Sequence, residues 1–348
     1  MIEYTSVTIE NLSVHHVGNK TNDEDLKLSK TFMDISDDHL KELLVKYFLA
    51  SFTSAEFYNF TFTNGDFKLN PLYTFASDIF KNFRSLHQNS IHIAKHLYEV
   101  SNHPQIKAGD LFIVYFSDLS LGGESVNAIG IFKSENKQSF LKLDSSESEF
   151  SLQYDDGINV EKLDKGCLIF ETEKENGFKV CIIDKANKSM EAQFWKESFL
   201  MLRPCSDDYH QTKDFLDIAK TFVTDHFAEE FEVNKTDQID MLNRSMDYFK
   251  THENFSKKEF EKEVFQDVAV IKSFRQFDDS YRMDNSIELE DNFEISVNAV
   301  KKQSKIFKSI LKLDKNFHIY IHGNKDLIEQ GVEKDGRKYY KIYFEKEA

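Results

Sequence analysis

The sequence is poor in the residues that build disulfide-rich, membrane-spanning or nucleotide-cradling proteins. It contains three Cys, three Pro, 12 Gly and one Trp among 348 residues. Three widely spaced cysteines favour reduced thiols over a disulfide framework. No apolar run approaches the ~18 residues that a bilayer-spanning helix needs. No glycine-rich loop leads into the Gly-Lys-Ser/Thr sequence that holds a nucleotide phosphate, so no cofactor is expected.

Basic charge is also scarce relative to acidic charge. The chain has 44 Lys+Arg against 60 Asp+Glu, a formal charge of −16. This balance argues against a uniformly basic protein that coats nucleic acid, and against a surface that adheres to anionic lipid. The first residues, MIEYTSVTIENLSV, include acids and lack the basic stretch and apolar run of a secretory signal. We therefore expect a cytoplasmic protein without membrane contact.

What the chain has in quantity is apolar and aromatic side chains, with 33 Phe and 14 Tyr. With 40% apolar and 30% charged residues it can bury a sizeable core, so disorder of the whole chain is not expected. Its length suggests two domains. The Arg203-Pro204-Cys205 step is the predicted boundary, giving domains over residues 1–204 and 205–348.

The first domain reads as helices followed by strands. The Ser36-Asp37-Asp38 segment, which offers an N-cap and an acidic first turn, and the Asn70-Pro71 step predict two helix starts. A third apolar stripe of helical spacing centres on Ala94. Short period-two segments then predict an antiparallel sheet: GDLFIVYF, NAIGIFKSE, FLKLD, FSLQY, GCLIFE and FKVCIID. A short helix around Trp195 closes this domain.

The second domain reads as helical from Asp207 to about Tyr281 and mixed thereafter. The tail predicts a strand at FEIS, a short helix at VNAVKKQSK and two hairpins. The first hairpin turns at DKN and the second at Lys334-Asp335-Gly336-Arg337. The predicted fold class is therefore α+β: N-terminal helices plus an antiparallel sheet, a helical middle region and a small mixed C-terminal piece with hairpins.

Three groups of residues are weak candidates for chemistry. His92 and His96 stand four apart on a predicted helix, a spacing that metal sites use, but their apolar neighbours favour packing. Cys167 and Cys181 lie on two predicted strands, and the two thiols could be neighbours if these strands pair as a hairpin. The simpler interpretation is that both are buried as small apolar side chains. His15 and His16 are adjacent in a predicted strand, so their rings face opposite sides.

A nuclease would need carboxylates around a metal ion with a lysine nearby, and the predicted sheet supplies Glu171, Glu173 and Lys179. In a chain with 60 acids this is a weak signal. No Ser, His and Asp arrangement has the spacing of a nucleophile elbow either. No catalytic residue is predicted, and the expected protein is not an enzyme.

The distribution of charge is more informative. Residues 298–348 carry 12 Lys+Arg and 7 Asp+Glu, a net of +5, so the other 297 residues carry 32 and 53, a net of −21. A lysine row can bind phosphates without reading bases. The predicted row is Lys301, Lys302, Lys305, Lys308, Lys312 and Lys315.

Two arrangements of this row remain open. A long helix would align Lys301, Lys305, Lys308 and Lys312 in one stripe. A strand over 306–313 would instead place Lys308 and Lys312 on one face, opposite Leu311 and Leu313.

Several strings resemble one bacterial family. They are VHHVGNK at 14–20, IAKHLYE at 93–99, NAIGIFKSE at 127–135, KLDKGCLIF at 162–170 and ILKLDKNFHIYIHG at 310–323. They are similar to the nucleoid-associated protein family of the NdpA or YejK type, in its Bacteroidetes-like branch. The resemblance implies a cytoplasmic, nucleoid-located protein that associates with double-stranded DNA, and type II topoisomerases as partners. It implies no catalytic residues and no DNA-contact motif.

Two functions follow as hypotheses. The first is direct, weak and salt-sensitive binding of double-stranded DNA, without strong sequence specificity, through the basic C-terminal face. The second is an adaptor that reaches the nucleoid through a protein such as a topoisomerase subunit, since an acidic body should be repelled by DNA. A metal-dependent nuclease is a minor third.

Overall fold

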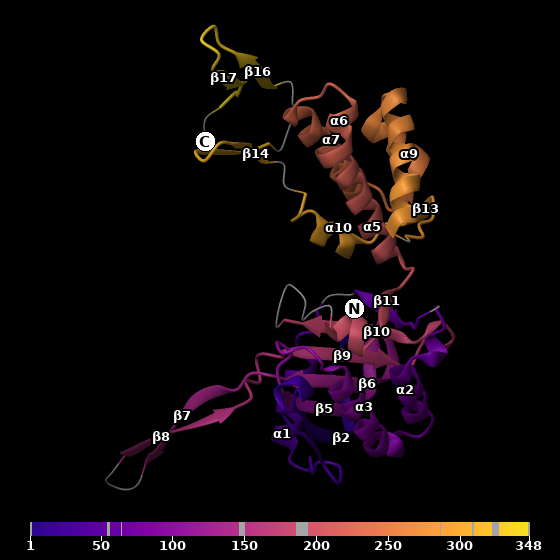
Figure 1. The fold of residues 1–348 in the computed structure, drawn as a ribbon, viewed down its shortest axis with the longest axis vertical. Coiled ribbons are helices and arrows are strands. Elements are labelled where there is room, and N and C mark those ends of the chain that lie inside the picture. The colour runs from indigo at the N-terminus through magenta and orange to yellow at the C-terminus, as the bar shows by residue number, and fades with distance from the viewer. Residues whose placement is uncertain are drawn as a thin grey trace. The chain divides into compact units, whose positions relative to one another are not determined.

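The computed structural model divides into two compact units, Met1–Cys205 and Ser206–Ala348, called unit 1 and unit 2 (Figure 1). It describes residues 2–53, 56–63, 65–145, 150–185, 194–285, 287–307, 310–321 and 327–346.

Unit 1 is built on an antiparallel sheet. Its strand order is β11-β4-β10-β9-β6-β5-β2-β3, and β1 also pairs with β5. The strands are β1 (Ile2–Glu3), β2 (Thr8–Val17), β3 (Leu26–Leu28), β4 (Phe57–Phe60), β5 (Gly109–Leu121), β6 (Glu124–Ser134), β9 (Lys165–Phe170), β10 (Lys179–Asp184) and β11 (Leu202–Pro204). Consecutive strands such as β5 and β6 are joined by a tight turn, as the short spacers in the sequence predict.

Helices cover both faces of this sheet, which explains why its central strands are apolar almost without interruption. On β5, Ile113 enters the core beneath α2 (Pro71–Lys81) and α3 (Leu86–Val100), whereas Val114 enters the core beneath α1 (Asp38–Leu49). Short 3-10 turns and a π-helical turn complete the unit: Lys20–Asn22, Phe67–Leu69, Phe83–Ser85, Lys174–Asn176 and Phe194–Phe199.

The helix starts in unit 1 follow the capping residues of the sequence. The Asp37 carboxylate accepts from the N–H of Leu40 at the start of α1. The buried Asn70 accepts from the N–H of Leu72 and Tyr73 at the start of α2. Both predicted starts are confirmed, because a side-chain acceptor satisfies N–H groups that have no partner within the helix.

The predicted pairing of the two cysteine-bearing strands is correct, but the thiols are not neighbours. The β9–β10 register places Cys167 opposite Ile182 and Cys181 opposite Leu168. The two thiols therefore point to opposite faces of the sheet, Cys167 into one core and Cys181 into the other. Burial raises the pKa of Cys181 to about 12 and raises that of Cys167 as well, so neither is a reactive thiolate.

The FLKLD and FSLQY segments are strands, but the prediction that they belong to the antiparallel sheet is wrong, because they lie outside it as a separate pair. Strands β7 (Gln138–Ser145) and β8 (Phe150–Gly157) pair only with each other and project from unit 1 as a long hairpin, named the β7–β8 arm (Figure 1). Its side chains are exposed along almost the whole of both strands.

Unit 2 is mainly helical and has a phenylalanine-rich core. Its helices are α5 (Asp208–Thr221), α6 (Phe227–Glu230), α7 (Lys235–Thr251), α8 (Lys257–Phe260), α9 (Val268–Asn285) and α10 (Val297–Gln303), with π-helical turns at Phe222–His226 and Glu261–Phe265. Phe215 lies at the centre, with the rings of Phe249, Phe255, Phe260 and Phe274 within 4.3 to 6.0 Å of its own.

Small antiparallel pairs complete unit 2. They are β12 (Asn254–Ser256) with β13 (Asn292–Glu294), β14 (Ile310–Leu313) with β15 (Phe317–Tyr320), and β16 (Ile328–Val332) with β17 (Lys338–Ile342). The last two pairs are the hairpins predicted for the tail. The α+β fold class is therefore confirmed.

Candidate nucleic-acid interface

The predicted lysine row is divided between helix α10, strand β14 and the turns that follow them in unit 2. The structure places five of its members, all exposed, on α10, in the turn after it, on β14 and in the β14–β15 turn: Lys301, Lys302, Lys305, Lys312 and Lys315. The sixth, Lys308, lies outside the described residues.

Helix α10 turns its lysines outward because its other side is buried. Val300 packs in the phenylalanine-rich core, and the buried Gln303 donates from Nε2 to Asp217 Oδ1 at 3.1 Å. Lys301 and Lys302 lie between these two positions in sequence and on the opposite side of the helix. The helix ends at Gln303, so the continuous helical stripe of lysines, one of the two predicted arrangements, is wrong.

After α10 the chain makes a turn over residues 304–306, and Phe307 then enters the core of unit 2. Its N–H bonds back to the carbonyl of Gln303, and its ring is buried among the other phenylalanines. Along β14, Leu311 is buried and Lys312 is exposed, which is the alternation of a strand. The second predicted arrangement is therefore correct over Ile310–Leu313.

Both lysine-bearing elements pack on α7. Helix α10 contacts α7 directly, and so does β14. Ile239 of α7 packs with Leu311 of β14 and with Ile321. Asn243 of α7 also donates from Nδ2 to the Ile321 carbonyl at 3.3 Å. The two groups of lysines are thus held by a common helix.

The lysines differ in how far neighbouring acids neutralise them. Within the described part of the chain, Lys301, Lys305, Lys312 and Lys315 have no carboxylate at ion-pair distance. Lys302 lies over the ring of Tyr209, with Nζ 5.8 Å from the ring centre.

In the second hairpin, β16–β17, two basic side chains are neutralised by ion pairs. Arg337 pairs with Asp335 at 2.7 Å, and Lys341 pairs with Glu329 at 3.7 Å. Two other basic residues of this hairpin, Lys334 and Lys338, are exposed and have no carboxylate at ion-pair distance within the described residues, so the second hairpin adds some positive charge to that of α10 and β14.

An open cleft of about 1020 Å³ lies beside α10. Lys250 and Lys301 line it on the basic side, and Glu253 and Glu294 contribute opposite charge. Because two carboxylates share this cleft, it is poorly suited to hold a phosphate. The exposed lysine ends outside it suit a backbone contact better.

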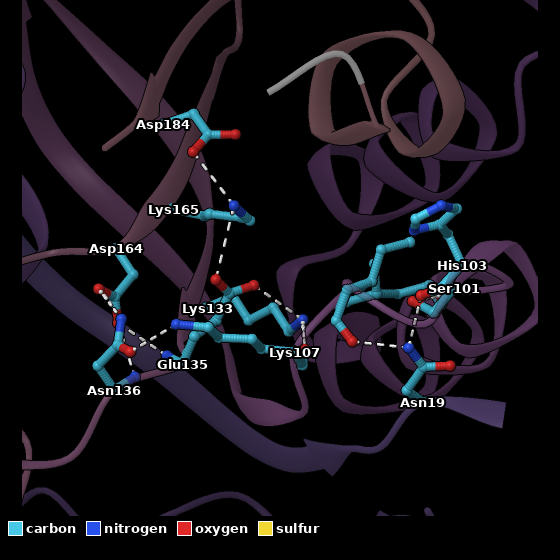
Figure 2. Close-up of polar contacts among 12 residues, drawn as sticks. Asn19, Ser101, His103, Lys107, Lys133, Glu135, Asn136, Asp164, Lys165 and Asp184 are labelled. Atoms are coloured by element: carbon cyan, nitrogen blue, oxygen red, sulfur yellow. Dashed lines mark hydrogen bonds and ion pairs between the residues drawn. The ribbon is translucent and has the colours of Figure 1, made fainter. Parts of the chain in front are cut away.

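A second group of charges, buried in unit 1, is not predicted from the sequence. Lys133 Nζ donates to the Lys107 carbonyl and to Glu135 Oε1, the latter at 3.0 Å (Figure 2). Lys165 Nζ lies 3.5 Å from Glu135 Oε2 and 3.1 Å from Asp184 Oδ1. Figure 2 shows these side chains as one connected row at the ends of β6, β9 and β10.

These charges are closed off from solvent. The side chains of Lys133, Glu135 and Lys165 are 1–2% exposed. Such a network leaves no room for a substrate, and it holds strand ends together. The signal in the sequence was the presence of charged residues next to apolar runs, in the NAIGIFKSE and KLDKGCLIF strings.

The two histidines considered as metal ligands are engaged in packing. His92 stacks on Phe75 with ring centres 5.6 Å apart, and His96 stacks on Phe199 at the same distance. His96 Nε2 also lies 3.2 Å from the Phe199 carbonyl oxygen. Burial lowers the pKa of His96. Across the described residues, no group of three or more possible ligands surrounds one point.

The residues considered for a nuclease are occupied as well. Lys179 Nζ donates to Glu173 Oε1 at 2.8 Å, and Asn127 Nδ2 donates to Glu171 Oε2 at 2.7 Å. Glu173 has a φ of 53° in the turn between β9 and β10. These contacts stabilise a turn and a strand edge.

Comparison with known proteins supplies the family. The family model described as nucleoid-associated protein YejK matches residues 13–337. Since the match covers nearly the whole chain, the protein belongs to this family, and a role at the nucleoid follows from membership. The comparison with curated proteins gives no significant match. Among the helices of the described residues, none is long and apolar enough to cross a membrane.

Proposed function

We propose that this member of the nucleoid-associated YejK family binds double-stranded DNA directly, without strong sequence specificity, through the lysines of α10 and β14. The observation that carries the proposal is the group of exposed lysines without carboxylate partners among the described residues, Lys301, Lys305, Lys312 and Lys315. Lysine ammonium groups neutralise phosphates and release counterions from DNA, and this contribution to affinity does not depend on base sequence.

The rest of the molecule limits how DNA can approach. Residues 1–297 carry 32 basic and 53 acidic residues, a net of −21. This charge repels the phosphate backbone at long range, and salt screens repulsion and attraction alike. Binding should therefore be weak, local to the C-terminal lysines and sensitive to salt. A non-enzymatic role fits this surface, which needs no reacting group.

The test is a titration of the full chain with a DNA duplex at several salt concentrations. Replacing Lys301, Lys302 and Lys305 with Gln should weaken binding. The slope of log K against log salt should become shallower by about 0.9 for each phosphate that the variant no longer neutralises. A second variant, with Lys312 and Lys315 replaced, reports on the hairpin.

The control replaces an equal number of lysines in the same unit but outside the tail. Lys258, Lys262 and Lys272 are exposed on or beside α8 and α9. Their replacement with Gln changes the net charge by the same amount and should leave the salt slope unchanged. Equal losses in the two triple variants would show that only total charge matters and would overturn the proposed interface.

The adaptor is the competing function, and the acidic body is the observation that favours it. A chain that binds no duplex at physiological salt, but binds a type II topoisomerase subunit, would replace direct DNA binding with recruitment through that partner.

A further inference from the structure

The β7–β8 arm is exposed on both faces, but only one face is apolar. Residues directly opposite each other in an antiparallel pair share a face. The register pairs Leu141 with Tyr154, Leu143 with Leu152, and Ser145 with Phe150. The large side chains of this face are 63–77% exposed: Leu141, Leu143, Phe150, Leu152 and Tyr154. They form a continuous apolar surface along the arm.

The other face of the arm is mainly polar. It carries the pairs Lys142 with Gln153 and Asp144 with Ser151, alternating with the apolar pairs. Its one large apolar residue, Phe140, lies near the root, close to Gly157, where a Cβ would come within 3.1 Å of the ring. The arm is thus amphipathic in the manner of a strand pair that covers a core, yet its apolar face is left uncovered by the described part of unit 1.

The root of the arm is firmly attached to the sheet. The buried Asp164 accepts through Oδ2 from the N–H of Glu135 and Asn136, and through Oδ1 from the Asn136 amide, all at 2.8–3.0 Å (Figure 2). Nearer the arm, Asn159, which follows β8, donates from Nδ2 to Oε1 of Gln138 at the start of β7 at 2.7 Å. These contacts tie the two ends of the arm to each other at its root.

We propose that the apolar face of the arm packs against the same face of a second copy of this chain, forming a symmetric dimer. An isolated two-stranded hairpin is only marginally stable in water, and a second hairpin packed about 10 Å away would bury its apolar face. A two-fold axis makes a single patch its own partner, so no other surface is required.

The area is sufficient for a stable dimer. Five large side chains of roughly 200 Å² each, about 70% exposed, offer about 700 Å² per arm, close to the ~800 Å² per partner of a specific interface. Face-to-face packing also leaves Lys142, Gln153 and Asp144 on the outer surfaces, in water.

The charge of the arm argues against DNA as the occupant. Residues 138–157 contain one Lys and five acids, a net of −4. This charge repels phosphates. In a face-to-face dimer Asp144 and Asp155 lie on the outer surfaces, whereas Asp156, opposite Ser139, lies on the packed face near the root of the arm, so the two arms also repel each other through charges that salt screens. Dimerisation should therefore strengthen as salt is raised, opposite in sign to the salt dependence of DNA binding.

The first experiment measures self-association of the full chain by sedimentation equilibrium without DNA. Replacing Leu143 and Leu152 with Thr keeps residues suited to a strand but removes four leucines from the dimer. We expect the dissociation constant to rise at least about 100-fold. The control replaces the adjacent opposite pair, Lys142 and Gln153, with Thr and should change it by less than about threefold. A wild-type chain that stays monomeric to about 100 µM would overturn the proposal.

The second experiment uses the burial of the native thiols. Cys167, Cys181 and Cys205 are all buried. A cysteine introduced on the arm is therefore the only exposed thiol among the described residues. Leu152→Cys should give a disulfide-linked dimer on oxidation, and Gln153→Cys, on the polar face, should give little. Equal cross-linking of the two variants would contradict a face-to-face arrangement. Neither experiment contains DNA, so its failure leaves the proposed DNA binding untouched.

Discussion

Individual residues in unit 1 carry charge and polarity in places where water is excluded. Glu135 lies between Lys133 and Lys165, and each of these ammonium groups has a further oxygen partner. A buried ion pair adds little to stability compared with an apolar pair, but removing one partner strands the other charge. The network is therefore more important for holding the strand ends in register than for its net energy.

Glu135→Gln should test this dependence. It leaves Lys133 and Lys165 without their shared carboxylate, and we expect the free energy of unfolding to fall by about 3 kcal/mol. Glu161→Gln is the control, because Glu161 pairs with Lys46 at the surface and is 65% exposed. It should cost less than about 1 kcal/mol. Denaturant titration measures both, and equal losses would contradict a special role for the buried group.

His15 lies in an environment that disfavours its protonated, charged form. It is buried, with Nε2 2.8 Å from Ser90 Oγ and Nδ1 accepting from the N–H of Ser29. Burial, assisted by the nearby His87, lowers its pKa from 6.5 to about 4. The adjacent His16 faces the other way and lies 2.9 Å from Asp110 Oδ1, as expected for neighbours in a strand.

The lowered pKa of His15 predicts loss of stability in mild acid. Above about pH 7 the His15 ring is neutral in both the folded and the unfolded chain. Below pH 6.5 the ring is protonated in the unfolded chain, whereas in the folded chain it stays neutral down to about pH 4. The unfolding free energy should therefore fall between pH 7 and 4, by at most about 3 kcal/mol from this residue. Denaturant titrations at pH 7.5 and 5 should show a smaller fall in His15→Asn, while the exposed His39→Asn retains the wild-type fall.

At the scale of elements, Asn70 at the start of α2 both caps the helix and connects it to other segments of unit 1. The Asn70 side chain caps α2 and, through Nδ2, donates to the carbonyls of Thr61 and Leu200 at 2.9 Å. One buried amide thus ties a helix start to the segments flanking β4 and β11. By contrast, Asp37 caps α1 at the surface, and its side-chain contact within the described part of the chain is the local one to Leu40.

The two caps should differ in what they contribute. Asn70→Ala loses the cap and leaves buried groups without partners, so we expect a loss of about 3 kcal/mol in the free energy of unfolding. Asp37→Ala should cost about 1 kcal/mol, the usual amount for an exposed cap. Asn70→Asp keeps the acceptor but not the donor, and an intermediate loss would separate the two contributions. Indistinguishable losses for Asn70→Ala and Asp37→Ala would show that the tertiary contacts of Asn70 are unimportant.

At the scale of the whole molecule, the chain has separate hydrophobic cores. Unit 1 buries residues on both faces of its sheet, and unit 2 buries the phenylalanines around Phe215. The predicted domain boundary at residue 204 stays a prediction about folding, which needs a measurement of stability in each unit.

Substitutions in the cores should test independent folding. Phe132→Ala removes a ring from unit 1, and Phe274→Ala removes one from unit 2, and each residue is fully buried. Each should cost about 4 kcal/mol and lower hydrogen-exchange protection in its own unit. The matched change in the other unit is the control. If either substitution reduced protection equally in both units, the two would fold as one domain.

The sequence by itself determined the α+β class, the helix starts in the Ser36-Asp37-Asp38 segment and at Asn70, the four strands β5, β6, β9 and β10 of the sheet, and the separation of charge between body and tail. These follow from local rules, because a capping side chain, a period of two or a run of lysines acts on neighbouring residues. The tertiary structure decided the rest. The burial of Phe307 in the core of unit 2 depends on contacts with distant residues, and the face of the sheet that Cys167 or Cys181 takes depends on the register between β9 and β10. The burial of Glu135 between two lysines, and an apolar arm left outside the sheet, arise from segments distant in sequence. No local pattern can report such contacts, because they exist only once the sheet has formed.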